Sequence, residues 1–383
     1  MNIEPALKAL AAALHGEGPA VELSAGPDGE PVVTPVPTPG FEDAVAVVRT
    51  SGSTGTPKAT VLTVDALAAS SMATAFALKG EGQWLLALPL QYVAGVQVLV
   101  RSLFAGTRPW AMDLSEGFTA EGFTAAALEL TDNIRFTSLV PTQLQRLLAS
   151  PSADTLAVLR RFNGILLGGA PASAQLLKSA RDAGLRVVTT YGAAETCGGC
   201  VYDGYPLEGV ALRLAEDGRI HLGGATLAAG YLGAPRQTAE AFVEEDGGRW
   251  YRTNDLGTLD ADGRLTVLGR ADDAIITGGV KVSAAHVQAE LEKSDGVTAA
   301  FVAGVESAKW GQAVAAYVAV AGTASGADGA GRDGAAWAEE WHRTLGLLAP
   351  KTVLPAGELI MLPNGKPDRL AMIERLNALH QGK

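Results

Sequence analysis

One short segment concentrates side chains that could bind a polyphosphate. Residues 50–58 read Thr-Ser-Gly-Ser-Thr-Gly-Thr-Pro-Lys and come just after the apolar run at 44–48. Glycines leave backbone N–H groups unobstructed, hydroxyls donate hydrogen bonds and a lysine adds positive charge, so the segment suits phosphate oxygens. It is not a Walker A loop, because the GxxxxGK[ST] spacing is missing and Ala59 follows the lysine. We predict a nucleotide-binding loop, with a flexible linker as the alternative. The candidate contacts are Thr50, Ser51, Ser53, Thr54 and Lys58.

Alternating strands and helices are predicted to hold this loop. Short apolar runs rich in β-branched residues alternate with segments of helical length, which is typical of a mainly parallel, layered α/β fold. The predicted strands are 44–48, 84–88, 136–140, 164–167 and 186–190, and the predicted helices are 63–78, 93–104, a segment after 141, and 172–183. Residues 20–40 hold five prolines and three glycines, so we predict an irregular lead-in there.

The texture of the sequence changes after about residue 209. Asp-Gly pairs at 217–218 and 262–263 lie between apolar alternations and indicate hairpins, so we predict an antiparallel β appendage to the large domain. Beyond it, the pattern suits a small α+β domain, with helices at 283–291, 337–347 and after 367, and strands near 301 and at 314–320. We predict a large αβ domain at 1–269 and a small, mobile C-terminal domain at 270–383.

Composition argues against several classes of partner. The formal net charge is -11 and no run of Lys or Arg interrupts the acidic balance, so nucleic acid and anionic membranes are disfavoured. The N-terminus lacks the basic start and apolar run of a signal peptide, and no apolar stretch approaches the roughly 18 residues of a spanning helix. We therefore expect a cytoplasmic protein without membrane insertion. The sequence does not specify the oligomeric state, and a homodimer stays open.

The two cysteines form a lone CxxC motif at Cys197 and Cys200. A tetrahedral zinc site would need two more ligands close by, and the CxxC motif stands alone. We predict two reduced thiols beside a glycine-rich turn, with a redox or regulatory role as the alternative.

The loop at 50–58 resembles the phosphate-binding signature of the adenylate-forming superfamily, which includes acyl- and aryl-CoA ligases, luciferases and peptide-synthetase adenylation domains. Six further segments resemble motifs of that superfamily in the same order. They are GGAP at 168–171, YGAAET at 191–196, YRTND at 251–255, LGRADD at 268–273, TGGVKV at 277–282 and PNGKPDR at 363–369. Three positions depart from the usual pattern, with Ala194 for Thr, Asn254 for Gly and Ser283 for Pro.

The resemblance implies a nucleotide site built from these motifs. It implies that Tyr191 stacks on the adenine, that Glu195 holds Mg2+ and that Thr196 contacts phosphate. Asp255 would accept hydrogen bonds from the ribose hydroxyls, and Arg270 would also contact the ribose. Gly168, Gly169, Ala170 and Gly192 would border the adenine, with Gly168 and Gly192 also facing the acid substrate.

The resemblance also implies a reaction in two steps. A carboxylate attacks the α-phosphorus of ATP, pyrophosphate leaves, and a thiol then attacks the acyl-adenylate. Lys366 would be the catalytic lysine, bridging the carboxylate and the α-phosphate. Asp272 would be the hinge, and Gly278, Gly279 and Lys281 would belong to the loop that forms the pantetheine tunnel. ATP and Mg2+ are thus the implied cofactors, and coenzyme A (CoA) the co-substrate.

Two segments resemble the o-succinylbenzoate:CoA ligases of menaquinone synthesis. They are LPLQYVAGV at 88–96, continuing to Leu103, and SLVPTQL at 138–144, continuing to Leu148. Tyr92 stands where these enzymes usually have His. An aromatic dicarboxylic acid needs a cation for its second carboxylate, and Arg101 is the candidate because it interrupts an apolar helix. A structural ion pair is the alternative for Arg101. A ligase for another acid, an enzyme that loads a carrier protein and an inactive relative stay open as alternatives.

Overall fold

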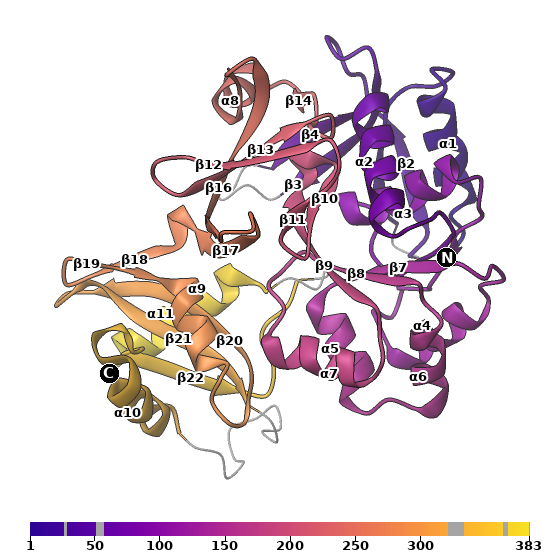
Figure 1. Ribbon diagram of the computed structural model, residues 1–383. Coiled ribbons are helices and arrows are strands. Elements are labelled where there is room, and N and C mark those ends of the chain that lie inside the picture. Colours follow the sequence, from indigo (N-terminus) through magenta and orange to yellow (C-terminus); the bar gives the residue numbers. More distant parts are fainter. Residues whose placement is uncertain (27–28, 51–56, 321–332, 363–366, 383) are drawn as a thin grey trace. The chain divides into compact units, whose positions relative to one another are not determined.

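The computed structural model describes residues 1–26, 29–50, 57–320, 333–362 and 367–382. Two compact units account for the chain (Figure 1). Unit 1 comprises Met1–Arg213, His221–Thr253 and Ala261–Arg264, and unit 2 comprises Leu214–Ile220, Asn254–Asp260 and Leu265–Lys383.

A seven-stranded sheet in unit 1 has the order β11-β10-β9-β8-β7-β5-β6. Its strands are β5 (Gln83–Leu86), β6 (Trp110–Ala111), β7 (Arg135–Leu139), β8 (Gly164–Leu167), β9 (Val187–Ala193), β10 (Gly198–Tyr202) and β11 (Tyr205–Pro206). The strands from β9 to β6 pair in parallel, and β10 and β11 continue the sheet in antiparallel fashion. The prediction of an α/β fold is confirmed.

A second sheet of unit 1 was only partly predicted. Its order is β14-β4-β3-β1-β2, with β1 (Val21–Ala25), β2 (Pro31–Pro35), β3 (Ala44–Thr50), β4 (Lys58–Thr63) and β14 (Gly230–Tyr231). The irregular lead-in predicted at 20–40 is wrong, because Val21 and Leu23 are buried in alternation and β1 pairs with both β2 and β3. β4 pairs antiparallel with β3, so the predicted nucleotide loop joins two strands of a hairpin.

Eight α-helices of unit 1 flank these strands in the described part of the chain. They are α1 (Glu4–Leu14), α2 (Val64–Ala77), α3 (Val93–Phe104), α4 (Ala120–Leu128), α5 (Pro141–Ala149), α6 (Ala153–Arg160), α7 (Ala174–Asp182) and α8 (Pro235–Ala241). Thr63 caps α2 as predicted, because its hydroxyl accepts the N–H of Ala66. Side-chain oxygens that accept the N–H groups of the first turn are what fix such helix starts.

A third sheet contains the predicted hairpins. Its order is β12-β13-β16-β15 with β17 on β16, and its strands are β12 (Val210–Leu214), β13 (Arg219–Gly224), β15 (Phe242–Glu245), β16 (Gly248–Leu259) and β17 (Leu265–Arg270). Asp217-Gly218 lies between β12 and β13, and Asp262-Gly263 between β16 and β17. The Asp-Gly pairs therefore mark two real reversals of the chain, with positive φ at both glycines.

A fourth sheet forms the centre of unit 2, with helices on both of its faces (Figure 1). Its order is β19-β18-β21-β20 with β22 on β21, and its strands are β18 (Ala274–Thr277), β19 (Val280–Ser283), β20 (Val297–Ser307), β21 (Gly311–Val320) and β22 (Thr352–Ala356). α9 (Ala284–Leu291) and α10 (Gly334–Leu345) pack with Val302 and Val314, whereas α11 (Arg369–Gln381) packs with Phe301 and Tyr317. Successive residues of a strand face opposite sides, so one sheet supports two apolar layers.

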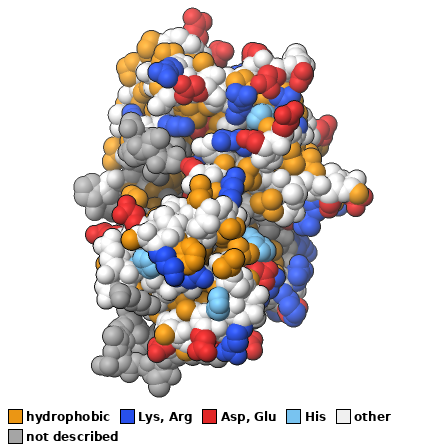
Figure 2. All heavy atoms as spheres, turned by 90° about the vertical axis from the view of Figure 1, so that its left-hand side faces the viewer, with side chains coloured by type: hydrophobic (Ala, Val, Ile, Leu, Met, Phe, Trp, Pro, Cys, Tyr) orange, Lys and Arg blue, Asp and Glu red, His pale blue; other side chains and the backbone are white. Residues whose placement is uncertain are grey.

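The surface drawn in Figure 2 mixes both signs of charge with apolar side chains. No helix among the described residues is long and apolar enough to cross a membrane.

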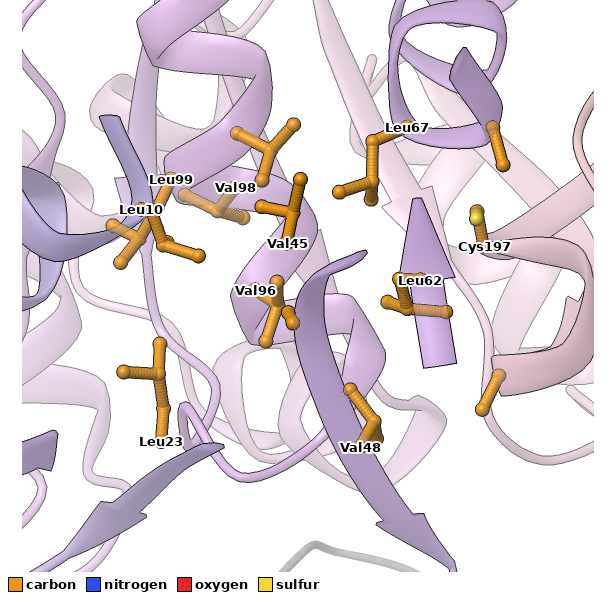
Figure 3. Close-up of a cluster of buried hydrophobic side chains, with 14 of the residues drawn as sticks. Leu10, Leu23, Val45, Val48, Leu62, Leu67, Val96, Val98, Leu99 and Cys197 are labelled. Atoms are coloured by element: carbon orange, nitrogen blue, oxygen red, sulfur yellow. The ribbon is translucent and has the colours of Figure 1, made fainter. Parts of the chain in front are cut away.

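The largest apolar cluster of unit 1 joins helices to the sheet that carries the predicted nucleotide loop (Figure 3). Leu10 of α1 and Val98 and Leu99 of α3 lie with Val45 of β3 and Leu62 of β4, and all five are buried to 2% exposure or less. Burying such side chains contributes roughly 1.5–3 kcal/mol each. The hairpin that carries the loop is therefore anchored at both of its strands.

Candidate functional site

The carboxyl ends of neighbouring parallel strands bring two predicted motifs together. β8 ends at Leu167, and Gly168 follows it beside β9. A Cβ at Gly168 would lie 2.4 Å from the hydroxyl oxygen of Thr190, so a larger residue would force the Thr190 side chain to move. In open α/β sheets, ligands bind at the carboxyl ends of the strands. The predicted adenine-binding residues that meet at this edge are Gly168, Gly169, Ala170, Tyr191 and Gly192.

Gly192 lies where the chain reverses between β9 and β10. The turn is a short 3-10 helix, η1 (Ala194–Thr196), and the two strands pair antiparallel on either side of it. A Cβ on Gly192 would sit 2.1 Å from the carbonyl oxygen of Gly198, a distance that no real contact allows. Glycine at this position therefore permits the tight turn between β9 and β10 in which Glu195 lies.

The hydroxyl of Thr196 is committed to the same turn. Its oxygen accepts the N–H of Ala193 at 2.9 Å and donates toward the carbonyl oxygen of Gly198 at 2.7 Å. The side chain is completely buried. The hydroxyl thus donates to one backbone group and accepts from another, which gives Thr196 a role in the turn; its phosphate contact stays a prediction.

Replacing Thr196 with valine is expected to lower the free energy of unfolding by about 1–3 kcal/mol, because two buried backbone groups lose their partner. Chemical denaturation measures this change. Thr196→Ser, which keeps the hydroxyl, is the control and should lose less than half as much. A valine variant as stable as the wild type would contradict this role.

Glu195, Tyr231 and Lys58 form a cluster beside the turn. The Glu195 side chain is buried, and its Oε1 accepts a hydrogen bond of 2.7 Å from the Tyr231 hydroxyl. The Nζ of Lys58 lies 4.9 Å from the centroid of the Tyr231 ring. The last residue of the predicted nucleotide loop and the predicted metal ligand therefore meet at one tyrosine. Tyr231 could not be predicted as a site residue, since nothing in its local sequence distinguishes it from a core aromatic.

A single carboxylate is a chemically reasonable protein ligand for Mg2+ bound to a nucleotide. Mg2+ keeps several waters and is usually held by one or two carboxylates together with substrate phosphates. Among the described residues, no group of three or more His, Cys, Asp or Glu side chains could hold a metal ion. Protein ligands alone would therefore not complete a metal site in this part of the chain. Ser51, Ser53, Thr54 and the catalytic candidate Lys366 lie outside the described residues. Thr50 pairs with Lys58 at the base of the hairpin.

In unit 2 the predicted ribose contacts and the predicted hinge residue are neighbours. Asp255 and Arg270 pair across β16 and β17, with Nη1 and Oδ1 3.9 Å apart. The Arg270 guanidinium also donates two hydrogen bonds to Asp272, at 2.9 and 2.8 Å. These hydrogen bonds raise the pKa of Arg270 against the opposing effect of burial. Arg270 therefore stays charged, and a paired fork of this kind fixes its plane.

The predicted tunnel loop is a tight hairpin in unit 2. Gly278 and Gly279 connect β18 to β19, with φ values of +56° and +82°. Positive φ at both central residues defines a turn that glycine adopts without strain. The N–H of Gly278 donates to the carbonyl oxygen of Trp310 at 3.0 Å, and Lys281 is exposed on β19. The glycines thus serve a two-residue reversal.

The two thiols of the CxxC motif are free and buried. Burial raises the pKa of Cys197 and raises that of Cys200 to about 12. Both thiols therefore remain protonated at neutral pH, which supports the prediction of reduced, structural cysteines over a reactive pair.

Tyr92 and Arg101 lie at opposite ends of α3. Tyr92 precedes the first residue of the helix and is partly exposed. Arg101 is 7% exposed and lies 5.2 Å from the centroid of the Trp84 ring, at the amino end of β5. Trp84 of β5 pairs with Phe136 of β7, which in turn pairs with Gly164 of β8. Gly168 lies four residues beyond Gly164, so it is about 13 Å further along the strand direction at 3.3 Å per residue. The structure therefore does not bring Arg101 to the edge that carries Gly168.

The surroundings of Arg101 are those of a buried structural cation. Burial lowers its pKa, and the nearby Tyr202 hydroxyl partly opposes that effect. Its Nε lacks a hydrogen-bond partner among the described residues. No carboxylate of the described residues pairs with it, so the ion-pair alternative is not borne out; the Trp84 ring and Tyr202 are its neighbours. Its contact with the second carboxylate of the acid stays a prediction.

Arg101→Met is expected to leave the KM for the acid substrate within twofold of wild type, because the guanidinium lies near the amino ends of the strands. Steady-state kinetics with the acid varied measures this. Stability should change little, since replacing a buried ion with an apolar residue of similar volume is often neutral or stabilising. A tenfold rise in KM with unchanged stability would instead support the predicted role of Arg101 in binding the second carboxylate of the acid.

Comparison with known proteins identifies the family. The model of the "AMP-binding enzyme" family matches residues 6–232, which is more than half of the chain. The chain belongs to this family. The predicted membership of the adenylate-forming superfamily is thereby confirmed.

Two curated relatives are named as ligases for the same acid. The chain is 45% identical over 281 residues to a probable 2-succinylbenzoate--CoA ligase of Mycobacterium tuberculosis, covering 73% of this chain and 72% of that protein. It is 32% identical over 311 residues to the 2-succinylbenzoate--CoA ligase of Bacillus licheniformis, covering 75% and 62% of the two chains.

Solved structures agree with the fold. The o-succinylbenzoate CoA synthetase (MenE) of Bacillus subtilis, in complex with the acyl-adenylate intermediate OSB-AMP, has a TM-score of 0.71 at 25% identity and covers 90% of this chain and 72% of that one. ATP-bound MatB from Rhodopseudomonas palustris has a TM-score of 0.76 at 26% identity, covering 93% and 74%.

Proposed function

We propose that this AMP-binding enzyme is an acid–thiol ligase for o-succinylbenzoate, which is the same compound as 2-succinylbenzoate. ATP and Mg2+ would convert the acid to an acyl-adenylate, and CoA would then take the acyl group, with release of pyrophosphate and AMP. The observation that carries the proposal is the 45% identity over 281 residues to a probable 2-succinylbenzoate--CoA ligase. The similarity to a structure that contains OSB-AMP supports it independently.

The first half-reaction joins two anions. A carboxylate oxygen attacks the α-phosphorus of ATP, the bond to the bridging oxygen breaks, and pyrophosphate leaves with that electron pair. The loop at 50–58 would hold the β- and γ-phosphates, and Lys366 would lie between the carboxylate and the α-phosphate. Mg2+ at Glu195 would neutralise charge on the phosphates. Charge stabilisation of this kind is commonly the largest contribution to catalysis.

Several of the predicted residues would hold the adenosine. Tyr191, Gly192 and the 168–170 segment would border the adenine, and Asp255 would accept hydrogen bonds from the ribose. Arg270, fixed by its two hydrogen bonds to Asp272, would present a charged plane to the ribose. Because Asp255 and Arg270 are paired strand neighbours, one substitution at either should weaken ATP binding through both.

The second half-reaction would use the small domain differently. In this proposal a large domain at 1–269 and a small one at 270–383 rotate about Asp272, which withdraws Lys366 and brings in Gly278, Gly279 and Lys281 of the hairpin. The CoA sulfur then attacks the acyl carbon and AMP leaves. Tyr92 would border the passage between the acid pocket and the thiol. A hinge of this kind lets one pocket serve two reactions.

Pyrophosphate exchange into ATP, measured across a panel of aryl and short acyl acids, tests the proposal. We expect o-succinylbenzoate to support exchange at least tenfold better than benzoate or succinate, because one of its carboxylates would react while the protein binds the other. If another acid supports faster exchange, the proposed substrate is wrong, but the proposed adenylate-forming reaction still holds. A cytoplasmic location and a homodimeric state are further parts of the proposal, which fractionation and light scattering would test.

A further inference from the structure

Tyr231 connects the predicted nucleotide loop to the predicted metal ligand. The side chain is 2% exposed, and its hydroxyl donates to Oε1 of Glu195 at 2.7 Å. Lys58 lies over its ring, with Nζ 4.9 Å from the centroid. The main chain of Tyr231 pairs with Thr60 of β4, two residues beyond Lys58. Tyr231 therefore contacts Glu195 through its hydroxyl, Lys58 through its ring and strand β4 through its backbone.

The segment that carries Tyr231 is fixed to Glu195 at a second point. The N–H of Ala228 donates to the main-chain carbonyl of Glu195 at 2.9 Å. Arg249 then donates to the carbonyl oxygens of Ala228 and Ala229 at 2.8 and 2.7 Å. Glu195 is thus held by its main chain and by its carboxylate from the same short segment. Such double attachment restricts rotation of a side chain that would otherwise keep several rotamers.

The phenol is suited to remain a donor. A tyrosine hydroxyl carries its proton at neutral pH, so the phenol donates and the Glu195 carboxylate accepts. A hydrogen bond from a neutral donor to a charged acceptor is stronger than one between neutral groups. It occupies Oε1 and leaves Oε2 without a bond from Tyr231.

We propose that Tyr231 is a positioning residue for the metal site. Its hydroxyl fixes the Glu195 carboxylate, which would hold Mg2+, and its ring lies under the Lys58 ammonium, which would bind phosphate. The inference rests on the proposed function only in taking Glu195 as the Mg2+ ligand; it does not depend on which acid reacts. Partners that orient a metal ligand typically contribute 10- to 100-fold in metal affinity or activity.

Tyr231→Phe is the sharpest test, because it removes the hydroxyl and keeps the ring under Lys58. We expect the Mg2+ concentration for half-maximal pyrophosphate exchange to rise about tenfold, with kcat at saturating Mg2+ within a few fold of wild type. The matched control is Tyr202→Phe. Tyr202 is also a buried tyrosine, and its hydroxyl lies 3.0 Å from that of Thr74. It should lose similar stability with unchanged Mg2+ dependence. Unchanged Mg2+ dependence in Tyr231→Phe would overturn the inference.

A double-mutant cycle with Glu195→Gln separates positioning from general destabilisation. If Tyr231 acts through Glu195, adding Tyr231→Phe to Glu195→Gln changes the Mg2+ dependence no further. A further rise in the double variant would overturn the inference. This comparison also serves if Tyr231→Phe alone does not fold, because the glutamine removes the buried charge.

Calorimetric titration of ATP, with and without Mg2+, gives a readout independent of the acid. Wild-type binding should tighten with Mg2+, and the gain should be about tenfold smaller in Tyr231→Phe. If this pattern holds while o-succinylbenzoate supports no exchange, only the proposed substrate fails. If ATP binds equally well without Mg2+ in the wild type, this inference fails.

Discussion

Lys366→Ala is expected to slow formation of the acyl-adenylate by about 100- to 1,000-fold, the range for loss of one charge-stabilising group. The ammonium would offset the repulsion between the carboxylate and the α-phosphate, so its loss falls on the first half-reaction. Pyrophosphate exchange measures that step. Thioester formation from a supplied adenylate should stay within a few fold of wild type, because CoA attack would not use this lysine.

Lys351→Ala is the matched control for this variant. Lys351 also belongs to unit 2 and to no predicted motif, so exchange should stay near the wild-type rate. Equal losses in both half-reactions of Lys366→Ala would contradict the assignment. A loss confined to thioester formation would place the lysine in the second step.

Glu195→Gln should have the second large effect, again about 100- to 1,000-fold on exchange. The amide keeps the shape of the side chain and can still accept a hydrogen bond from Tyr231, but it removes the negative charge that would hold Mg2+. Raising the Mg2+ concentration should recover part of the rate, which a titration of exchange against Mg2+ would show.

Glu292→Gln controls for loss of a partly buried carboxylate. Its side chain accepts the N–H of Ala300 at 3.1 Å, in unit 2 and outside every predicted motif. We expect unchanged Mg2+ dependence for this variant. A Glu195→Gln enzyme with wild-type Mg2+ dependence would show that the metal is held elsewhere.

Strand positions were predictable where apolar runs are bounded by turn signals. The run at 44–48 became β3 and the run at 164–167 became β8, because four or five consecutive buried positions specify a strand covered on both faces. The segment 58–63 was missed as a strand, since it follows the loop directly and ends at the Thr63 cap of α2. Its pairing with β3 depends on contacts between separate segments, which the pattern of apolar residues along the sequence does not reveal.

The motifs were predictable as a set, but their geometry was not. Spacing alone could not show that the Thr196 hydroxyl is satisfied by the turn that it belongs to. The hydrogen bond between Tyr231 and Glu195 joins residues 36 positions apart, and only the pairing of β14 with β4 places that tyrosine beside the predicted loop. The position of Arg101 could not be predicted for a related reason: a helix antiparallel to its strand carries its two ends to opposite ends of that strand.

The proposed enzyme converts a specific carboxylic acid to its CoA thioester through an adenylate. Incubating purified protein with ATP, Mg2+, o-succinylbenzoate and CoA, and identifying the products by mass, tests this conversion. We expect o-succinylbenzoyl-CoA and AMP in equal amounts, and OSB-AMP with pyrophosphate when CoA is omitted. Release of ADP in place of AMP, or no consumption of ATP with any carboxylic acid, would contradict it.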